Sequence, residues 1–126
     1  MTEPQAAPAL ASPAAGRVLT QAAVRAAARL GLAQKDLAAV LGVSASTVSR
    51  FAQRPLDPRS KEGELAVLFV RLYRSLDAIT GGDDAVARAW LRNDNDALGD
   101  APLKLVQTVP GLVNVIAYLD ARRAIV

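Results

Sequence analysis

The sequence predicts an all-α protein built from two small helical modules. Just over half of the 126 residues are apolar, many of these are alanine, and aromatic residues make up only 4%. Such a composition favours closely packed helices. No segment alternates between apolar and polar positions with β-branched side chains, so we expect no sheet. The third observation is a helix–turn–helix pattern between Gln34 and Arg54.

The start of the chain is predicted to be a disordered tail, residues 1–16. It contains three prolines and no apolar periodicity. No basic start precedes an apolar segment, so we do not expect a secretory signal. The first helix is expected from Thr20, which suits an N-cap, to Leu30, with Gly31 ending it.

Residues 17–59 are predicted to form the helix–turn–helix module, with its later helices over 33–40 and 45–53. Val48 and Phe51 supply the apolar edge of the last helix. The motif also needs two apolar anchors one turn apart, a small residue at the helix crossing, a glycine at the turn and a capping serine. These are Leu37, Leu41, Ala38, Gly42 and Ser44.

The outer side of this motif carries short hydroxyls and cations, which can approach a DNA major groove without steric conflict. The expected base-edge contacts are Ser46, Thr47 and Arg50. The expected phosphate and positioning contacts are Gln34, Lys35, Ser44, Ser49 and Arg54. The alternative is an ordinary helical hairpin whose polar residues face solvent.

The charge distribution favours a polyanion as partner of the first half. Residues 1–60 hold seven Lys/Arg and three Asp/Glu, a balance of +4, whereas residues 61–126 hold eight and nine, a balance of −1. A positive excess beside the helix–turn–helix is what DNA binding requires. An uneven scatter of surface charge is the alternative.

The absence of Cys and His removes whole classes of chemistry. Disulfides, zinc fingers, thiol nucleophiles and imidazole acid–base catalysis are all excluded. The lack of Cys is consistent with a reducing cytoplasm, where we expect the protein. The longest apolar run, Leu65 to Val70, is six residues, so we expect no membrane span.

Residues 60–126 are predicted to form a second helical module. A long helix is expected over 61–79, and its apolar surface is wide enough to serve as a core helix, a dimer seam, or both. Shorter helices are expected over 84–92 and 103–106, and a last one follows a Thr108 cap. Trp90 is expected to fill the core.

The turn between Asn93 and Pro102 clusters carboxylates and invites a calcium interpretation. Its spacing fails the EF-hand pattern, because Leu98 stands where an oxygen ligand is needed and Leu105 where the bidentate Glu belongs. We therefore expect no metal and no cofactor.

Two stretches resemble a known family. D-L-A-A-V-L-G-V-S-A-S-T-V-S-R-F, from Asp36 to Phe51, resembles the DNA-binding motif of Xre-class repressors. The second half resembles the toxin-binding domain of the Xre–MbcA–ParS antitoxins, although Asp100 stands where that family usually has a second glycine. The residues that carry this second resemblance are Trp90, Leu91, Asn95, Ala97, Leu98, Gly99, Pro102, Leu103, Thr108, Gly111, Leu112, Val115 and Leu119.

The resemblance implies an antitoxin that pairs with a RES-domain toxin, an enzyme that degrades NAD⁺. Such antitoxins block the toxin's active site by direct contact, often with the C-terminal end, and repress their own operon as oligomers on double-stranded operator DNA. On this basis residues 60–126 are expected to bind the toxin and to form a homodimer or higher oligomer. The expected toxin contacts are Asp120, Arg122, Arg123, Ile125 and Val126.

Other functions stay open from the sequence. Arg122 and Arg123 would also complement the helix dipole if they only finished the last helix. The main rival is a stand-alone dimeric Xre-type repressor with no toxin partner. An enzyme would have to work without His or Cys, so we do not expect one.

Overall fold

The structure, a computed structural model, describes residues 13–125. These residues form helices and no strand, which confirms the all-α prediction; an isolated bridge joins Asn95 and Asp100. The tail predicted for residues 1–16 lies outside the described part up to residue 12. The helices are α1 (Pro13–Arg29), α2 (Gln34–Leu41), α3 (Ala45–Ser49), α4 (Lys61–Ile79), α5 (Asp84–Arg92), α6 (Pro102–Leu105) and α7 (Val109–Ile125).

Helix α1 begins seven residues before the predicted start, so residues 13–16 are helical rather than part of a tail. Thr20 is not an N-cap. Its side chain is buried, and its hydroxyl donates to the Gly16 carbonyl at 2.7 Å while accepting the Leu56 backbone N–H at 2.8 Å. Gly16 has no Cβ, and one placed there would lie 2.5 Å from the Leu56 carbonyl oxygen. These contacts hold α1 against the segment that precedes α4.

We predict that Thr20→Val destabilises the fold although the two side chains have nearly the same shape. The valine would leave the Leu56 N–H buried without a partner, which costs about 1–3 kcal/mol. Urea unfolding followed by circular dichroism measures the loss, with Thr20→Ser as the control that keeps the hydroxyl. A Thr20→Val variant as stable as the parent protein would show that this hydrogen bond contributes nothing.

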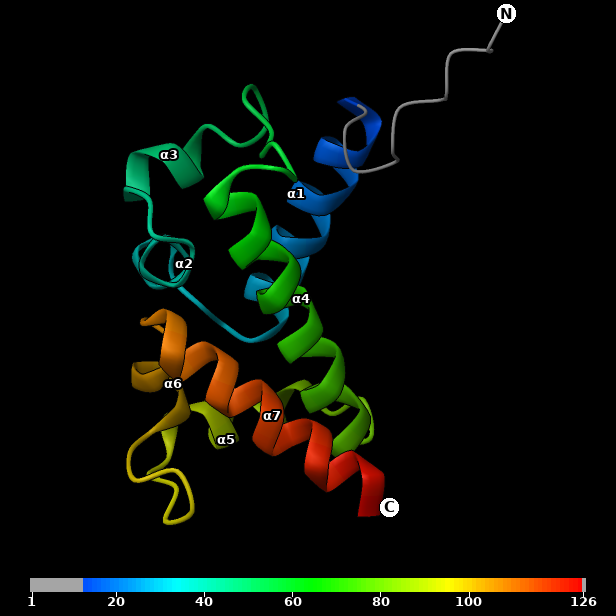
Figure 1. The fold of residues 1–126 in the computed structure, drawn as a ribbon, viewed down its shortest axis with the longest axis vertical. Coiled ribbons are helices and arrows are strands. Elements are labelled where there is room, and N and C mark those ends of the chain that lie inside the picture. Colours follow the sequence, from blue (N-terminus) through cyan, green and yellow to red (C-terminus); the bar gives the residue numbers. More distant parts are fainter. Residues whose placement is uncertain (1–12, 126) are drawn as a thin grey trace, which may run out of the picture.

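Helix α4 is the central element of the fold (Figure 1). It packs against α1 and α7 and also contacts α2 and α5. Its largest fully buried side chains, Phe69, Leu72 and Leu76, belong to one continuous hydrophobic core that includes residues from both halves of the chain. The apolar width of α4 is therefore explained by neighbours on several sides.

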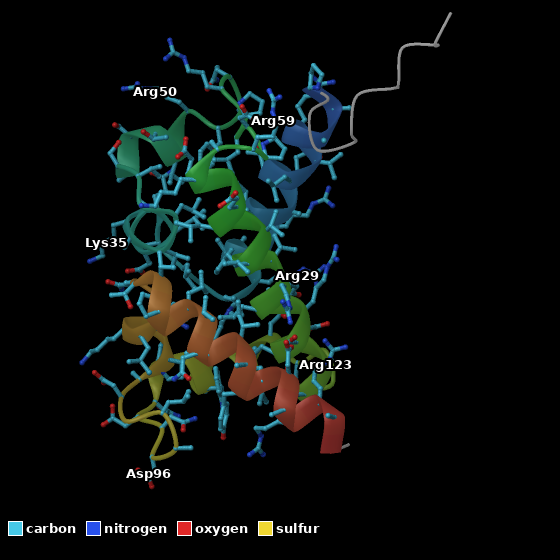
Figure 2. The ribbon with its side chains drawn as sticks, viewed as in Figure 1. Arg29, Lys35, Arg50, Arg59, Asp96 and Arg123 are labelled. Atoms are coloured by element: carbon cyan, nitrogen blue, oxygen red, sulfur yellow. The ribbon has the colours of Figure 1, made fainter. Side chains whose placement is uncertain are left out.

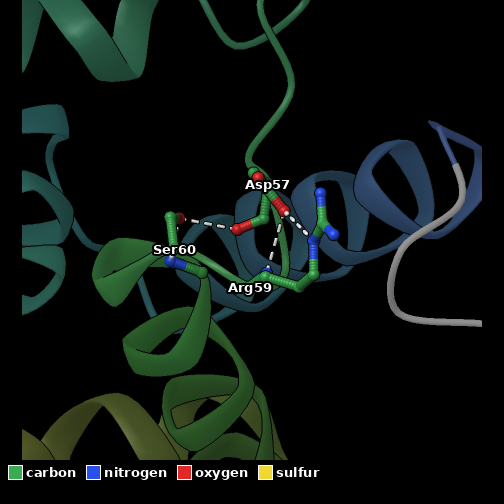
Figure 3. Close-up of polar contacts among 4 residues, drawn as sticks. Asp57, Arg59 and Ser60 are labelled. Atoms are coloured by element: carbon green, nitrogen blue, oxygen red, sulfur yellow. Dashed lines mark hydrogen bonds and ion pairs between the residues drawn. The ribbon is translucent and has the colours of Figure 1, made fainter. Parts of the chain in front are cut away.

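The link into α4 is fixed by local hydrogen bonds (Figure 3). The Ser60 hydroxyl donates to the Asp57 carbonyl at 2.6 Å and accepts the Gly63 N–H at 3.0 Å, which caps the helix. The Asp57 carboxylate accepts the Arg59 N–H at 2.9 Å and forms an ion pair with the Arg59 side chain at 3.6 Å. The helix–turn–helix is thus joined to α4 by an ordered turn.

Two arginines of α5 cap the C-terminal end of α1. Arg88 donates to the Arg29 carbonyl at 2.7 Å. Arg92 donates to the carbonyls of Leu30 at 3.0 Å and Gly31 at 2.8 Å. Carbonyls at a helix C-terminus lack intrahelical partners and carry partial negative charge, so guanidinium groups stabilise them. These bonds tie the second half of the chain to the first.

None of the helices in the described part of the chain is long and apolar enough to cross a membrane.

Candidate functional site

The turn between α2 and α3 has the predicted helix–turn–helix geometry. Leu37, Ala38 and Leu41 are buried, which places the anchors and the small residue at the contact with α3 and the core. Gly42 adopts a left-handed backbone with φ of 71° and donates its N–H to the Ala38 carbonyl. A residue with a side chain would be strained there, so the glycine sets the direction of α3.

Helix α3 is shorter than predicted. Ser44 caps it by accepting the Thr47 N–H at 3.1 Å, as expected, but the regular helix ends at Ser49 instead of Gln53. The backbone then forms a 3₁₀-type turn, in which the Arg50 N–H donates to the Thr47 carbonyl three residues earlier at 3.1 Å. Arg50 is consequently the C-terminal cap of α3 and not a residue of its middle.

Every residue that we expect to contact DNA is exposed in the structure. Lys35 and Arg50 project from the α2–α3 side of the molecule, away from Arg29 and Arg123 (Figure 2). Within the described residues, the side chains of Lys35, Arg50 and Arg54 make no hydrogen bond or ion pair. These three cations are free to reach phosphates or base edges.

The hydroxyls of the same surface are partly engaged. The Ser44 hydroxyl lies 3.0 Å from that of Ser46 and 2.9 Å from that of Thr47. Ser49 donates to the Ser46 carbonyl at 2.8 Å. Each hydroxyl has both a donor and two acceptor positions, so Ser46 and Thr47 retain capacity for a further partner. The main role of the Ser44 hydroxyl in the fold is to cap α3.

The acidic turn between α5 and α6 is organised by Asn95. Its side-chain oxygen accepts the Leu98 N–H at 3.2 Å, and its carbonyl accepts the Gly99 N–H at 2.8 Å. The Asp100 carboxylate bonds the Ala101 N–H at 2.7 Å. Among the described residues, Asp, Glu, Cys and His side chains form no group of three or more that could hold a metal ion.

A polar network joins α7 to α4. Asp120 forms an ion pair with Arg71 and accepts a hydrogen bond from the buried Ser75 hydroxyl at 2.9 Å. Arg123 donates to the same Ser75 oxygen at 3.1 Å. Asp120 and Arg123 were both expected to contact the toxin. Instead they bond to Arg71 and Ser75 of α4, two partners that the sequence does not indicate.

The Asp120 carboxyl is kept ionised by this network. Burial acts to raise its pKa, but hydrogen bonds from Ser75 and Arg71, with the charges of Arg71 and Arg123, outweigh burial and lower the pKa below its ordinary value. A carboxyl whose pKa is lowered by folding stabilises the fold above its unfolded pKa. That contribution is lost as the pH falls through the lowered value.

Trp90, Tyr118 and Arg122 form a stack across α5 and α7. The two rings are stacked with centroids 6.3 Å apart, and the Arg122 guanidinium lies 5.7 Å from the Tyr118 centroid. Trp90 is partly buried and packs against the hydrophobic core, so it lies at the edge of the core rather than inside it. Trp, Tyr and Arg are the residue types most enriched at energetically important positions of protein interfaces. Val126 and the side chain of Ile125 lie outside the described part.

Two protein-family models match this sequence. The antitoxin Xre-like helix-turn-helix domain matches residues 9–71, which is half of the chain. The protein belongs to the Xre-like antitoxin family. The antitoxin Xre/MbcA/ParS C-terminal toxin-binding domain matches residues 75–124 of this antitoxin. A search of curated proteins finds no match.

The two matches place the expected contacts in separate parts of the antitoxin. All the residues expected to contact DNA lie in the helix–turn–helix match, and Asp120, Arg122 and Arg123 lie in the toxin-binding match. Ile125 and Val126 fall just beyond its end. Helix α4 is divided between the two matches, since the first ends at Arg71 and the second begins at Ser75.

Proposed function

We propose that this antitoxin neutralises a RES-type toxin that degrades NAD⁺, and that it represses its own operon by binding operator DNA. The observation that carries the proposal is the presence of both matched domains, one after the other, in a single chain. The antitoxin acts in the cytoplasm, as a homodimer or higher oligomer. It makes and breaks no covalent bond.

The DNA half of the proposal is supported by the exposed surface of α2 and α3. Ser46, Thr47 and Arg50 would contact base edges from α3. Lys35 at the start of α2 and Arg54 beyond α3 would contact phosphates and fix the position of α3 in the groove. Gln34, Ser44 and Ser49 complete this set.

The toxin half is supported by the side chains at the end of α7. Arg122 is exposed and held in place by Tyr118, so little side-chain entropy is lost when it binds an acidic or polar cleft. Asp120 and Arg123 support α7 from the other side through Arg71 and Ser75. Inhibition is steric: the C-terminal end, with Ile125 and Val126, covers the toxin's active site.

The test uses the purified product of the neighbouring gene. NAD⁺ consumption by that protein is measured with increasing amounts of the antitoxin. We expect NAD⁺ hydrolysis by the neighbour alone and a stoichiometric loss of activity on addition. A neighbour that leaves NAD⁺ intact, or an activity that the antitoxin does not inhibit, would contradict the proposal and favour a stand-alone repressor.

A further inference from the structure

An apolar surface on the described part of the chain has no partner within the fold. It consists of Val18 on α1, Val67 on α4 and Val113 on α7, with exposed fractions of 66%, 43% and 51%, and of the two grooves between these helices. We refer to it as the outer face. The groove between α1 and α4 has a volume of about 520 Å³ and a mainly apolar lining. Arg71 lines both grooves, so they adjoin on α4.

The outer face combines its valines with charges of both signs along α4. Glu64, Val67, Arg71 and Arg74 recur every three or four residues and are all exposed, so they share one side of the helix. Glu64 and Arg74 make no ion pair or side-chain hydrogen bond with any described residue. The acidic end of this stripe comes before Val67 and the basic end follows it.

This order of charges makes the stripe complementary to itself. Glu64 and Arg74 each lie five residues, about 7.5 Å along the helix axis, from the midpoint between Val67 and Arg71. If a second α4 packs antiparallel about that midpoint, Glu64 of each copy faces Arg74 of the other. Val67 of each copy then faces Arg71 of the other, and the two Val67 side chains lie on either side of the two-fold axis, about 3 Å from it along the helix, as in an isologous interface.

We propose that the outer face is the surface through which two copies of the antitoxin associate, with α4 packed antiparallel to α4 of the partner copy. This dimer rests on the proposed function, because it would be the oligomer named there, but its formation requires neither toxin nor DNA. The face includes Val18 and Val67, which belong to the helix–turn–helix match and not to the toxin-binding match. The exposed sides of α2 and α3 remain uncovered in this dimer.

Charge reversals on purified antitoxin, without toxin or DNA, test the pairing. The unmodified antitoxin is expected to have twice its chain mass of 13.2 kDa in sedimentation equilibrium. Glu64→Arg and Arg74→Glu each place like charges opposite one another, which should weaken self-association by at least about tenfold. An equimolar mixture of the two variants faces positive with negative at both contacts and should restore the dimer.

Lys104→Glu is the matched control, because Lys104 is exposed on α6 and takes no part in the outer face. It should leave the dimer intact, and circular dichroism confirms that each variant is folded. A monomeric parent protein would overturn the proposal. So would single variants that dimerise normally, or a mixture that stays monomeric. A separate pull-down of each variant with the toxin tests the other occupant of this surface. Single variants that stay dimeric but no longer hold the toxin would assign the outer face to the toxin, which would also overturn the proposal.

Discussion

Removal of residues 121–126 is expected to abolish toxin neutralisation while operator binding is retained. The truncation deletes Arg122 and Arg123, and loss of a central arginine from an interface costs about 2 kcal/mol or more. The buried anchors of α7 precede the cut, so the fold should survive; they are Leu112, Val115, Ile116 and Leu119. Growth of cells that co-express the toxin gives the first readout, and a gel-shift titration with operator DNA gives the second.

A shorter truncation separates the arginines from the end of the chain. Removal of residues 124–126 keeps Arg122 on Tyr118 and Arg123 on Ser75. If the last residues occupy the toxin's active site, both truncations fail to protect; if the arginines carry the contact, only the longer one fails. Full protection by the 121–126 truncation would show that the C-terminal end of α7 is not the inhibitory element.

Arg50→Ala is expected to weaken operator binding by about 1–3 kcal/mol and to relax sequence preference, as loss of a bidentate base contact does. The Arg50 side chain is exposed at the end of α3 and makes no ion pair or hydrogen bond with any described residue, so no folding defect is expected. The measurement is a gel-shift titration on operator DNA and on a scrambled duplex.

Two further arginine variants serve as a comparison and a control for Arg50→Ala. Arg54→Ala should weaken binding to both duplexes alike and reduce the salt dependence by about one unit, as expected of a phosphate contact. Arg29→Ala removes an arginine that is directed away from the α2–α3 side, so it should leave binding to both duplexes unchanged (Figure 2). Equal affinity and equal sequence preference for the parent protein and Arg50→Ala would exclude Arg50 from base contact.

Features that depend on neighbouring residues were predictable from the sequence. The Gly42 turn and the Ser44 cap involve partners no more than four residues away, and both were confirmed. The same holds for Thr108, whose hydroxyl accepts the Gly111 N–H at 3.1 Å at the start of α7. The end of α3 was misjudged because apolar Val48 and Phe51 are buried equally well when the chain tightens into turns after Ser49.

Features that depend on distant residues were missed. The sequence around Thr20 predicts a cap, whereas its hydroxyl bonds the Leu56 N–H, which lies 36 residues away. The Arg71–Asp120 ion pair spans 49 residues, and nothing in either local sequence indicates it. Trp90 packs against the core, as its spacing on α5 predicts, but nothing in that spacing indicates that Tyr118 covers one side of the ring.

We propose that one chain joins a DNA-binding surface to a toxin-binding surface. Co-purification of the antitoxin with the product of the neighbouring gene tests this most directly. Native mass spectrometry of the tagged antitoxin, expressed with that gene and mixed with operator DNA, should detect one assembly that contains both polypeptides and the duplex. Antitoxin that binds the duplex and leaves the second polypeptide free would show that the chain has no toxin-binding surface for that partner.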